Sequence, residues 1–481
     1  MLDGPRLRRI VIACLALVLL GFLALALKVH RMPDLSPWHE LTLENRFRAS
    51  DAGGDFDFSD YLVNEEKLFQ ELEDRLVSTI PNTPDNAWCR YSAGGVTNPS
   101  HFPVNWNRTT ELRPTEPVGT ALLLHGLTDS PYSLRAVAEI LFGEGYHVVA
   151  LRLPGHGINS GALTTARLRD WRAAVDLGAR HLETEVGSGR PFLLVGYSNG
   201  AALALDYTFR ALDEDLPRPH RLVLFSPQIA VSPFAPLASL HQAVSWIPGL
   251  ERLRWIDIIP EFDPYKYNSF PKNAGRQAYL LTRDIQRSLD RLIREDRVGE
   301  VPPMLSFASL ADATVRVEAV VDSLYDRIRD PRSELVIFDV NRGAAVLPFL
   351  AINHIDRLQA LTARTDLPYR LTVVGNLEPS SSAVVVRTWA PGASHPEVEN
   401  LGVEWPPGVY SLSHVAIPFP PGDPIYGSEP VTAVGTTVPS LGTLEPRGEK
   451  KLLRIPAGWF DRLRSNPFFN YVEDRLLEVS R

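Results

Sequence analysis

The chain is poor in cysteine and has no excess of positive charge, and each shortage excludes a class of protein. Only Cys14 and Cys89 occur in 481 residues. Cys14 lies in an N-terminal apolar run, which leaves Cys89 alone and makes an intrachain disulfide unavailable. The net charge of −8 argues against nucleic acid as a partner. Hydrophobic residues make up 44% and charged residues 22% of the chain. These shares are typical of globular proteins, and the length allows one large domain with insertions or two domains.

An apolar stretch stands near the N-terminus, where residues 10–27 contain no charged side chain. Basic residues flank the stretch on both sides. Its length is near the lower limit for a membrane-spanning helix and is long for the apolar part of a signal peptide. We therefore expect residues 1–31 to be a membrane anchor, with the rest of the chain outside the cytoplasm, on the periplasmic or extracellular side. The alternative is a signal peptide cleaved near residues 24–26, which would give a secreted protein.

Residues 192–200, Phe-Leu-Leu-Val-Gly-Tyr-Ser-Asn-Gly, combine a short apolar run with a tight turn. The apolar run predicts a buried strand, and residues 201–205 predict a helix directly after the turn. Strand, Gly-x-Ser-x-Gly and helix together are typical of a nucleophile elbow, in which the serine, here Ser198, has a strained backbone. Gly196 and Gly200 fit this turn because side chains there would collide across it. Since glycine and serine are common in loops, the motif alone is also compatible with a turn that carries no chemistry.

Two further motifs stand upstream of the elbow. The predicted strand at 120–124 runs into HGLTDSPYS, and the one at 147–151 leads into LPGHG at 153–157. With GYSNG, in this order and spacing, these motifs resemble the α/β-hydrolase superfamily. The nearest branch contains carboxylesterases and monoacylglycerol-lipase-like enzymes, together with serine-aminopeptidase-like hydrolases. The resemblance implies an oxyanion hole formed by the backbone N–H groups of Leu127 and Asn199.

The order of the predicted elements indicates an α/β fold. Strands are expected at 119–125, 146–153, 192–197, 221–226, 304–310 and 335–338, and helices near 65–80, 132–143, 165–185, 199–212 and 468–479. This alternation implies a mostly parallel central sheet with helices on both faces, and the resemblance implies the α/β-hydrolase fold. The segment 87–106 is expected to supply leading antiparallel strands. The segment 369–389 suits an added hairpin or an extension of the sheet.

Residues 228–302 lie between two predicted strands and are rich in large apolar residues. In the enzymes that the chain resembles, a helical lid lies here over the nucleophile and would line a mostly hydrophobic pocket. Trp246 and Trp255 in this segment are therefore expected to bind substrate, as are Gly126 and Tyr197 beside the nucleophile. A packed helical subdomain without substrate contact is the alternative. The expected divisions are anchor or signal peptide (1–31), linker and helix (32–86), first part of the core (87–227), lid (228–302), second part of the core (303–340), insertion (341–408) and C-terminal part of the core (409–481).

Asp312 follows the strand predicted at 304–310, at the position where the superfamily carries the acid of its catalytic triad. A buried carboxylate there would orient the catalytic histidine and stabilise its charged form. Asp312 could instead cap a helix expected at 315–329. Asp322 and Asp339 are the rival acids.

A triad histidine normally follows within a few residues of the last parallel strand, here 335–338, but this chain has none there. Because the superfamily's order is serine, acid, histidine, only His354, His395 and His414 qualify. His354 falls in an expected helix, and His395 lies in a loop with no strand to fix it. We therefore expect His414, which follows a short apolar–polar run, to be the base. His156 precedes the nucleophile and is expected to be structural.

These residues predict a membrane-anchored serine hydrolase that acts on small-molecule or lipid carboxylic esters. Ser198 would attack the carbonyl, His414 would take its proton, and Asp312 would orient the imidazole. This chemistry needs neither a metal nor an organic cofactor. A serine peptidase or amidase is an alternative, because the same triad cleaves both kinds of bond. A second alternative is a non-catalytic binding protein on the same scaffold.

Overall fold

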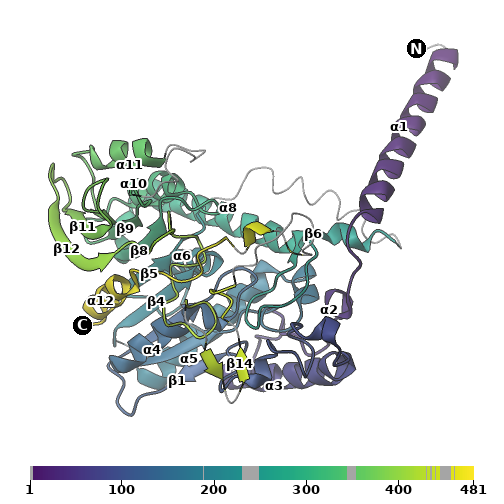
Figure 1. Ribbon diagram of the computed structural model, residues 1–481, viewed down its shortest axis with the longest axis horizontal. Coiled ribbons are helices and arrows are strands. Elements are labelled where there is room, and N and C mark those ends of the chain that lie inside the picture. The colour runs from purple at the N-terminus through teal and green to yellow at the C-terminus, as the bar shows by residue number, and fades with distance from the viewer. Residues whose placement is uncertain are drawn as a thin grey trace.

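One large sheet runs through the molecule (Figure 1). The structure is a computed structural model and describes residues 4–187, 189–229, 249–343, 354–428, 431–433, 436–438, 440–444, 455, 457–459 and 461–481. Within these residues the sheet has ten strands in the order β1-β3-β2-β4-β5-β8-β9-β10-β11-β12. Their bounds are β1 Thr110–Leu112, β2 Gly119–Leu124, β3 Tyr146–Leu151, β4 Phe192–Tyr197, β5 Arg221–Phe225, β8 Met304–Ser309, β9 Glu334–Phe338, β10 Arg370–Asn376, β11 Ala383–Trp389 and β12 Glu397–Glu404. The short pairs β6 Trp255–Asp257 with β7 Phe270–Pro271, and β13 Val431–Ala433 with β14 Thr436–Val438, lie apart from it.

The middle of the sheet is parallel. Strands β3, β2, β4, β5, β8, β9 and β10 run in one direction, whereas β1 and β11 run antiparallel to the strands beside them, and β12 to β11. Every residue of β2, β3 and β4 is buried, as expected for parallel strands covered on both faces. The prediction of a mostly parallel α/β sheet is therefore confirmed.

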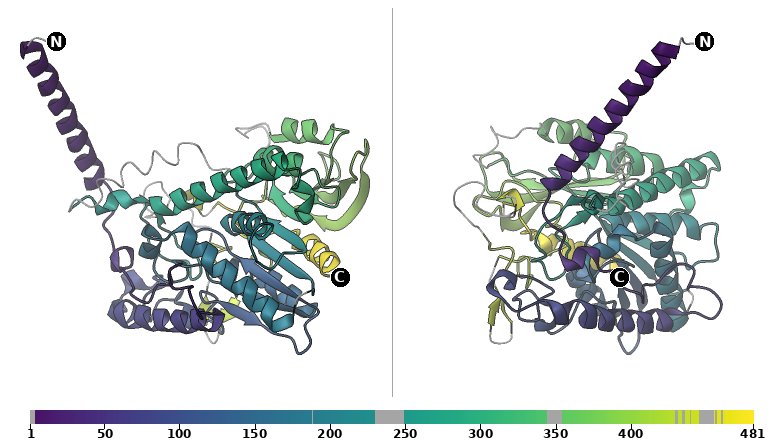
Figure 2. Two further views of the ribbon diagram at one scale, coloured as in Figure 1. Left: turned by 180° about the vertical axis from the view of Figure 1, so that it is seen from behind. Right: turned by 90° about the vertical axis from the view of Figure 1, so that its right-hand side faces the viewer.

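Helices cover both faces of the sheet (Figure 2). Their bounds are α1 Gly4–His30, α2 Pro37–Glu40, α3 Phe58–Arg75, α4 Arg135–Gly143, α5 Leu168–Val186, α6 Asn199–Ala211, α8 Lys272–Arg294, α9 Val317–Val320, α10 Asp326–Ile328, α11 His354–Thr362 and α12 Phe469–Ser480, with a π-helical turn at Val321–Tyr325. Leu122 and Leu124 of β2 pack on one face with α5, α6 and α8. Ala121 and Leu123 pack on the opposite face with α4 and α12. The alternation of side chains along a strand thus produces two cores.

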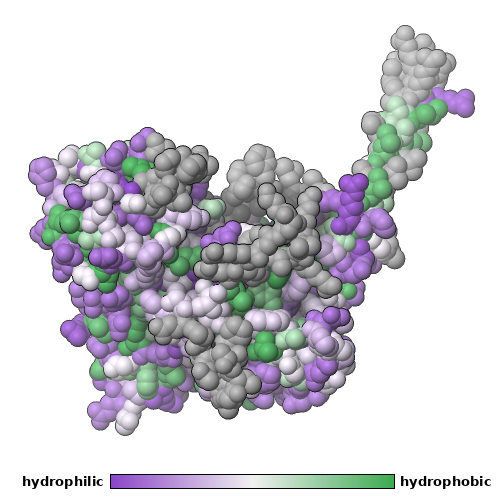
Figure 3. All heavy atoms as spheres, viewed as in Figure 1, coloured by the Kyte–Doolittle hydropathy of each residue, from purple (hydrophilic) through white to green (hydrophobic). Residues whose placement is uncertain are grey.

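The N-terminal apolar stretch forms α1, which projects away from the rest of the molecule (Figures 1 and 2). Its described side chains include exposed apolar residues such as Leu15 and Leu20, and hydrophobic residues are visible along it in Figure 3. A membrane span needs about 20 consecutive, mainly apolar residues. No helix in the described part of the chain combines the length and the apolar character that a crossing requires. The prediction that residues 1–31 anchor the chain in a membrane is therefore wrong.

The segment after α1 packs against the domain, although its sequence suggested a linker. Trp38, Leu43 and Phe47 are buried. The Nδ2 group of Asn159, in the loop after β3, donates to the carbonyl oxygens of Trp38 at 3.0 Å and Leu41 at 2.8 Å. These contacts join residues more than a hundred positions apart, so local composition could not indicate them.

Residues 87–106 form turns and short helical turns rather than the predicted antiparallel strands. The backbone N–H of Arg90 donates to the carbonyl oxygen of Glu261 at 3.0 Å, in a loop outside the sheet. A Cβ on Gly95 would lie 2.3 Å from the carbonyl oxygen of Cys89, so the chain folds back tightly at this glycine. The antiparallel strand at this edge of the sheet is β1 instead.

The segment predicted as a lid, 228–302, contains a long helix, α8, that packs in the core. Residues 230–248, including Trp246, lie outside the described residues. In α8, Leu281, Ile285 and Leu289 recur at helical spacing and are fully buried in the core beside α6. This helix therefore belongs to the layer that covers the sheet.

The insertion predicted at 341–408 extends the sheet beyond β9. β10 pairs in parallel with β9, and β11 and β12 follow as antiparallel strands. The hairpin expected at 369–389 corresponds to β10 and β11, and β12 was not foreseen. After β12 the chain returns to the carboxyl ends of β8 and β9.

Candidate active site

Ser198 lies in the turn between β4 and α6, in a backbone conformation that few side chains adopt. Its φ is 54° and its ψ is −113°, and such strain is typical of functional sites. A Cβ on Gly196 would lie 2.4 Å from the Cα of Ala201, and one on Gly200 would lie 1.9 Å from the carbonyl oxygen of Leu124. The two glycines therefore let the turn pass close to α6 and to the end of β2.

Gly200→Ala is expected to destabilise the fold strongly, because its methyl group would meet the backbone of β2 rather than a movable side chain. Overpacking in a core costs about 1–3 kcal/mol and sometimes more, and we expect at least the upper end of that range. Chemical denaturation measures the loss. Gly299→Ala is the matched control, since a Cβ there meets nothing within 4 Å. Equal stability of the two variants would contradict the tight approach at Gly200.

Two polar side chains reach Ser198 from distant parts of the chain. Nε2 of His414 lies 3.0 Å from Oγ of Ser198, and its Nδ1 lies 2.6 Å from Oδ2 of Asp312. Oδ1 of Asp312 accepts the backbone N–H groups of Thr314 at 2.7 Å and Val315 at 2.8 Å. All three side chains are buried. With the carboxylate accepting Nδ1–H, the tautomer of His414 leaves Nε2 free to accept the serine proton.

The loop that carries His414 is fastened to the carboxyl ends of β8 and β9. Oγ of Ser309, the last residue of β8, donates to the carbonyl oxygen of Leu412 at 2.8 Å. The backbone N–H of Asn341, just after β9, donates to the carbonyl oxygen of Tyr410 at 2.8 Å. Sequence reasoning missed both Ser309 and Asn341, because nothing local marks a residue whose partner lies far along the chain.

His125 orients the loop that follows β2. Its Nε2 accepts the N–H of Leu153 at 3.0 Å, so Nδ1 carries the proton and donates to the carbonyl oxygen of Gly126 at 2.9 Å. Burial lowers the pKa of His125 to about 3, which keeps the ring neutral. In a trans peptide the C=O and the next N–H point in opposite directions, so the N–H of Leu127 faces away from this ring. Among the hydrogen bonds of the described residues, neither this N–H nor that of Asn199 has an acceptor.

Comparison with known proteins identifies the family. The model of the "Alpha/beta hydrolase family" matches residues 121–406, more than half of the chain. The chain belongs to this family. The fold class and the superfamily resemblance expected from the three motifs are thereby confirmed.

Relatives with known names are similar to part of this hydrolase. A curated thermostable monoacylglycerol lipase from Bacillus sp. (strain H-257) is 36% identical over 226 residues, which cover 46% of this chain and 80% of that protein. Among solved structures, a monoacylglycerol lipase from Paleococcus ferrophilus has 20% identity and a TM-score of 0.36, covering 48% of this chain and 88% of its own. A soluble variant of the Saccharomyces cerevisiae monoglyceride lipase has 13% identity and a TM-score of 0.37, covering 48% of this chain and 82% of its own.

A cavity of about 60 Å³ lies near Ser198 and His414 of the hydrolase. Tyr197 and Val415, the sequence neighbours of Ser198 and His414, line it. Charged side chains form much of its remaining wall, namely Asp129, Asp263, Lys266, Arg462 and Arg464. Phe419, Tyr426 and Trp459 also line it, and most of the surface that faces the cavity is apolar.

The four residues predicted to bind substrate fall into three groups. Gly126 and Tyr197 lie together beside the site, since a Cβ on Gly126 would lie 3.1 Å from the ring of Tyr197, and this ring lies 5.5 Å from that of His414. Trp255 in β6 is buried against His39, with ring centroids 4.8 Å apart, and it does not line the cavity. Trp246 lies outside the described residues.

The other candidate histidines of the hydrolase lie in different surroundings. His156 is fully buried, and its ring packs edge-on against that of His125 at 4.9 Å. Burial holds the pKa of His156 well below its ordinary value. His395 is exposed between β11 and β12, and His354 is the first residue of α11. In the described contacts, Ser198 has a hydrogen bond with the ring of His414 and with none of these.

Proposed function

We propose that this hydrolase cleaves carboxylic esters through an acyl-enzyme intermediate, with Ser198 as nucleophile, His414 as general base and Asp312 as orienting acid. The observation that carries the proposal is the position of the His414 ring, whose nitrogens lie 3.0 Å from Ser198 Oγ and 2.6 Å from Asp312 Oδ2. A nucleophile, its base and a group that orients the base need this mutual hydrogen-bond reach. The strained backbone of Ser198 adds support, because strain of this kind exposes the hydroxyl of a nucleophile elbow.

In the proposed reaction, Ser198 Oγ attacks the ester carbonyl while its proton passes to Nε2 of His414. The N–H groups of Leu127 and Asn199 stabilise the negative charge that develops on the carbonyl oxygen, and Asp312 stabilises the imidazolium. His414 then gives the proton to the leaving alcohol, and the acyl group stays on Ser198. Water, deprotonated by His414, releases the acid and restores the serine.

A lipid ester is the proposed substrate class. The relative with 36% identity is named a monoacylglycerol lipase, so a glycerol ester of one fatty acid is the first substrate to test. A peptidase or amidase is the second candidate function, because the same triad cleaves both kinds of bond and Arg462 in the cavity lining could contact a polar substrate.

A matched pair of substrates separates these two functions. A p-nitrophenyl ester and a p-nitroanilide of the same acyl group release related chromophores, so only the bond differs. We expect turnover of the ester at a much higher kcat/KM than that of the anilide. A preference for the anilide would favour the peptidase, and turnover of neither by the folded chain would favour a binding protein.

Asp312→Asn is expected to lower kcat by about 10⁴-fold, because the amide no longer fixes the tautomer of the base. Asp339→Asn is the matched control: Asp339 is also buried after a sheet strand, but it forms an ion pair with Arg342 at 2.8 Å. Asp322, the other rival acid, is exposed on the π-helical turn. Steady-state kinetics on folded variants gives the comparison, and a larger loss for Asp339→Asn would move the acid assignment there.

A further inference from the structure

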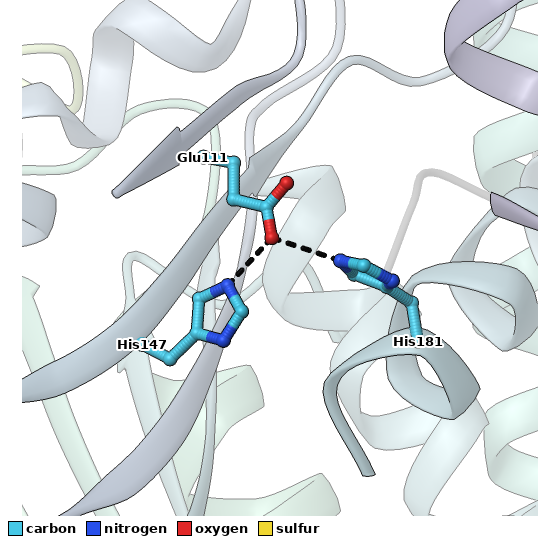
Figure 4. Close-up of side chains that lie close together, drawn as sticks. All are labelled: Glu111, His147 and His181. Carbon is cyan, nitrogen blue, oxygen red and sulfur yellow. Dashed lines mark hydrogen bonds and ion pairs between the residues drawn. The ribbon is translucent and has the colours of Figure 1, made fainter. Parts of the chain in front are cut away.

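Three side chains with metal-binding atoms converge at the end of the sheet that lies away from Ser198 (Figure 4). Glu111 lies in β1, His147 is the second residue of β3, and His181 lies in α5. Because β3 and β4 run parallel to β2, His147 near the start of β3 and Ser198 after the end of β4 stand at opposite ends of the sheet. The cluster is therefore separate from the proposed catalytic residues.

The ligand atoms of this cluster point at one place. Nε2 of His147 lies 2.6 Å and Nε2 of His181 lies 2.8 Å from the same carboxylate oxygen, Oε1 of Glu111 (Figure 4). The second oxygen, Oε2, takes part in neither contact. Two imidazoles that merely needed a hydrogen-bond acceptor could use one oxygen each. Instead, both rings point their Nε2 atoms at one carboxylate oxygen, which brings the three candidate ligand atoms close together.

The chemical nature of the three ligand atoms indicates which metal ion would fit. Two imidazole nitrogens and one carboxylate oxygen are the protein ligands of open zinc sites, which keep a fourth position for water. Tetrahedral bonds of about 2.0–2.2 Å hold ligand atoms about 3.3 Å apart. The three atoms all lie within 4.8 Å of one another, so a small rotation of the Glu111 carboxylate would admit the ion.

The residues around the cluster pack against the histidine rings and leave one side of the cluster open to solvent. The side chain of His147 is fully buried, whereas those of His181 and Glu111 are 16% and 27% exposed. Phe58 of α3 stacks on the ring of His181 with centroids 4.5 Å apart. Solvent thus reaches the cluster from one side, where a water ligand could complete the coordination.

We infer that Glu111, His147 and His181 bind a divalent transition-metal ion, zinc by preference, and that the ion fastens β1 and α5 to β3. The strand β1 has three residues and lies at the edge of the sheet, so it gains from a link of this kind. Arg113 and Glu185 form an ion pair between the same neighbourhoods of chain. The role of the ion is structural, and ester hydrolysis does not depend on it.

The hydrogen bonds made by the other ring nitrogens of the two histidines influence how tightly the site is expected to bind zinc. A histidine that binds metal usually donates its other ring N–H, and loss of such a partner costs about 10–100-fold in affinity. Nδ1 of His147 is buried and has no hydrogen-bond partner within the described residues. We therefore expect zinc to bind, but more weakly than in closed structural sites with a complete outer shell.

Equilibrium dialysis of the metal-stripped full chain against zinc, followed by elemental analysis, tests the site. We expect one zinc per chain in the wild type and a large loss of binding in His181→Ala and Glu111→Gln. His395→Ala is the matched control, because it removes an exposed histidine elsewhere and should leave zinc binding intact. Magnesium should not bind, since it prefers an all-oxygen site. Zinc that is absent from the wild type, or bound equally by all variants, would overturn the inference.

X-ray absorption at the zinc edge keeps the test decisive if a variant fails to fold, because it uses the wild type alone. We expect imidazole nitrogens at about 2.0–2.1 Å in the first shell. A shell of oxygen atoms only would show adventitious zinc and would contradict the site. Thermal unfolding adds a second readout: zinc should raise the Tm of the wild type and of His395→Ala and leave that of His181→Ala unchanged.

Discussion

Ser198→Ala is expected to lower kcat for short p-nitrophenyl esters by about 10⁶-fold, the size of loss seen when a triad nucleophile is removed. The hydroxyl is the only group of this residue that the proposed reaction uses, and alanine keeps the backbone of the elbow. The fold should therefore survive, and thermal unfolding would establish that it does. The residual rate should be that of an enzyme that binds the ester but has no nucleophile.

Ser226→Ala is the matched control for this change. Ser226 is also a buried serine directly after a parallel strand, also has a positive φ, here 45°, and donates its backbone N–H to Phe307 at 2.7 Å. Its Oγ has no hydrogen-bond partner among the described residues. We expect near wild-type turnover from Ser226→Ala. Turnover near wild type in Ser198→Ala, or a comparable loss in both variants, would contradict the nucleophile assignment.

His414→Ala is expected to lower kcat by a similar factor, about 10⁶-fold. Removing the histidine of a triad lowers kcat about as much as removing the serine, because the two residues act as a unit. In this variant no other imidazole has a described contact with Ser198 to replace the ring. Steady-state hydrolysis measures the loss, and the rate of reaction with an active-site phosphonate should fall with it.

Two histidine controls accompany this variant. His395→Ala and His354→Ala should keep most of the activity, because His395 is exposed between β11 and β12 and His354 begins α11. If either of them lost more activity than His414→Ala, the assignment of His414 as the general base would be contradicted.

The elbow could be predicted because its physical cause is local. The apolar run of β4, two glycines and a serine between them specify a turn that side chains would block, and the structure has Ser198 at φ 54° in that turn. The parallel strands could also be predicted from the sequence. Both faces of β2, β3 and β4 are covered, so nearly every residue in them is apolar.

His414 as a candidate came from the order of the triad and from the exclusion of other histidines, and its role stays a prediction. The contacts that position it could not be foreseen. Ser309 donates a hydrogen bond to Leu412, and Asn341 donates one to Tyr410. The chain between the two residues of each pair includes the strands β10, β11 and β12. Long-range hydrogen bonds leave no pattern within a local window of sequence.

The predictions that differ from the structure share one cause, which is that the packing partners lie far along the chain. The aromatic residues of 87–106 suggested strands, but the backbone of this segment bonds to the loop around Glu261. The segment 228–302 was predicted as a lid partly because it is apolar, whereas Leu281 of α8 in this segment is buried in the core beside α6. Trp255 likewise packs against His39, far along the chain. Apolar character predicts burial, whereas the partner depends on the tertiary fold.

Labelling with a fluorophosphonate, followed by mass spectrometry of the digested chain, tests the central claim most directly, because it reports an activated serine without knowledge of the substrate. We predict a single stoichiometric adduct on Ser198 in the wild type, its absence in Ser198→Ala, and slow formation in His414→Ala. An unlabelled but folded wild type, an adduct on another serine, or equal labelling of Ser198→Ala would contradict the account.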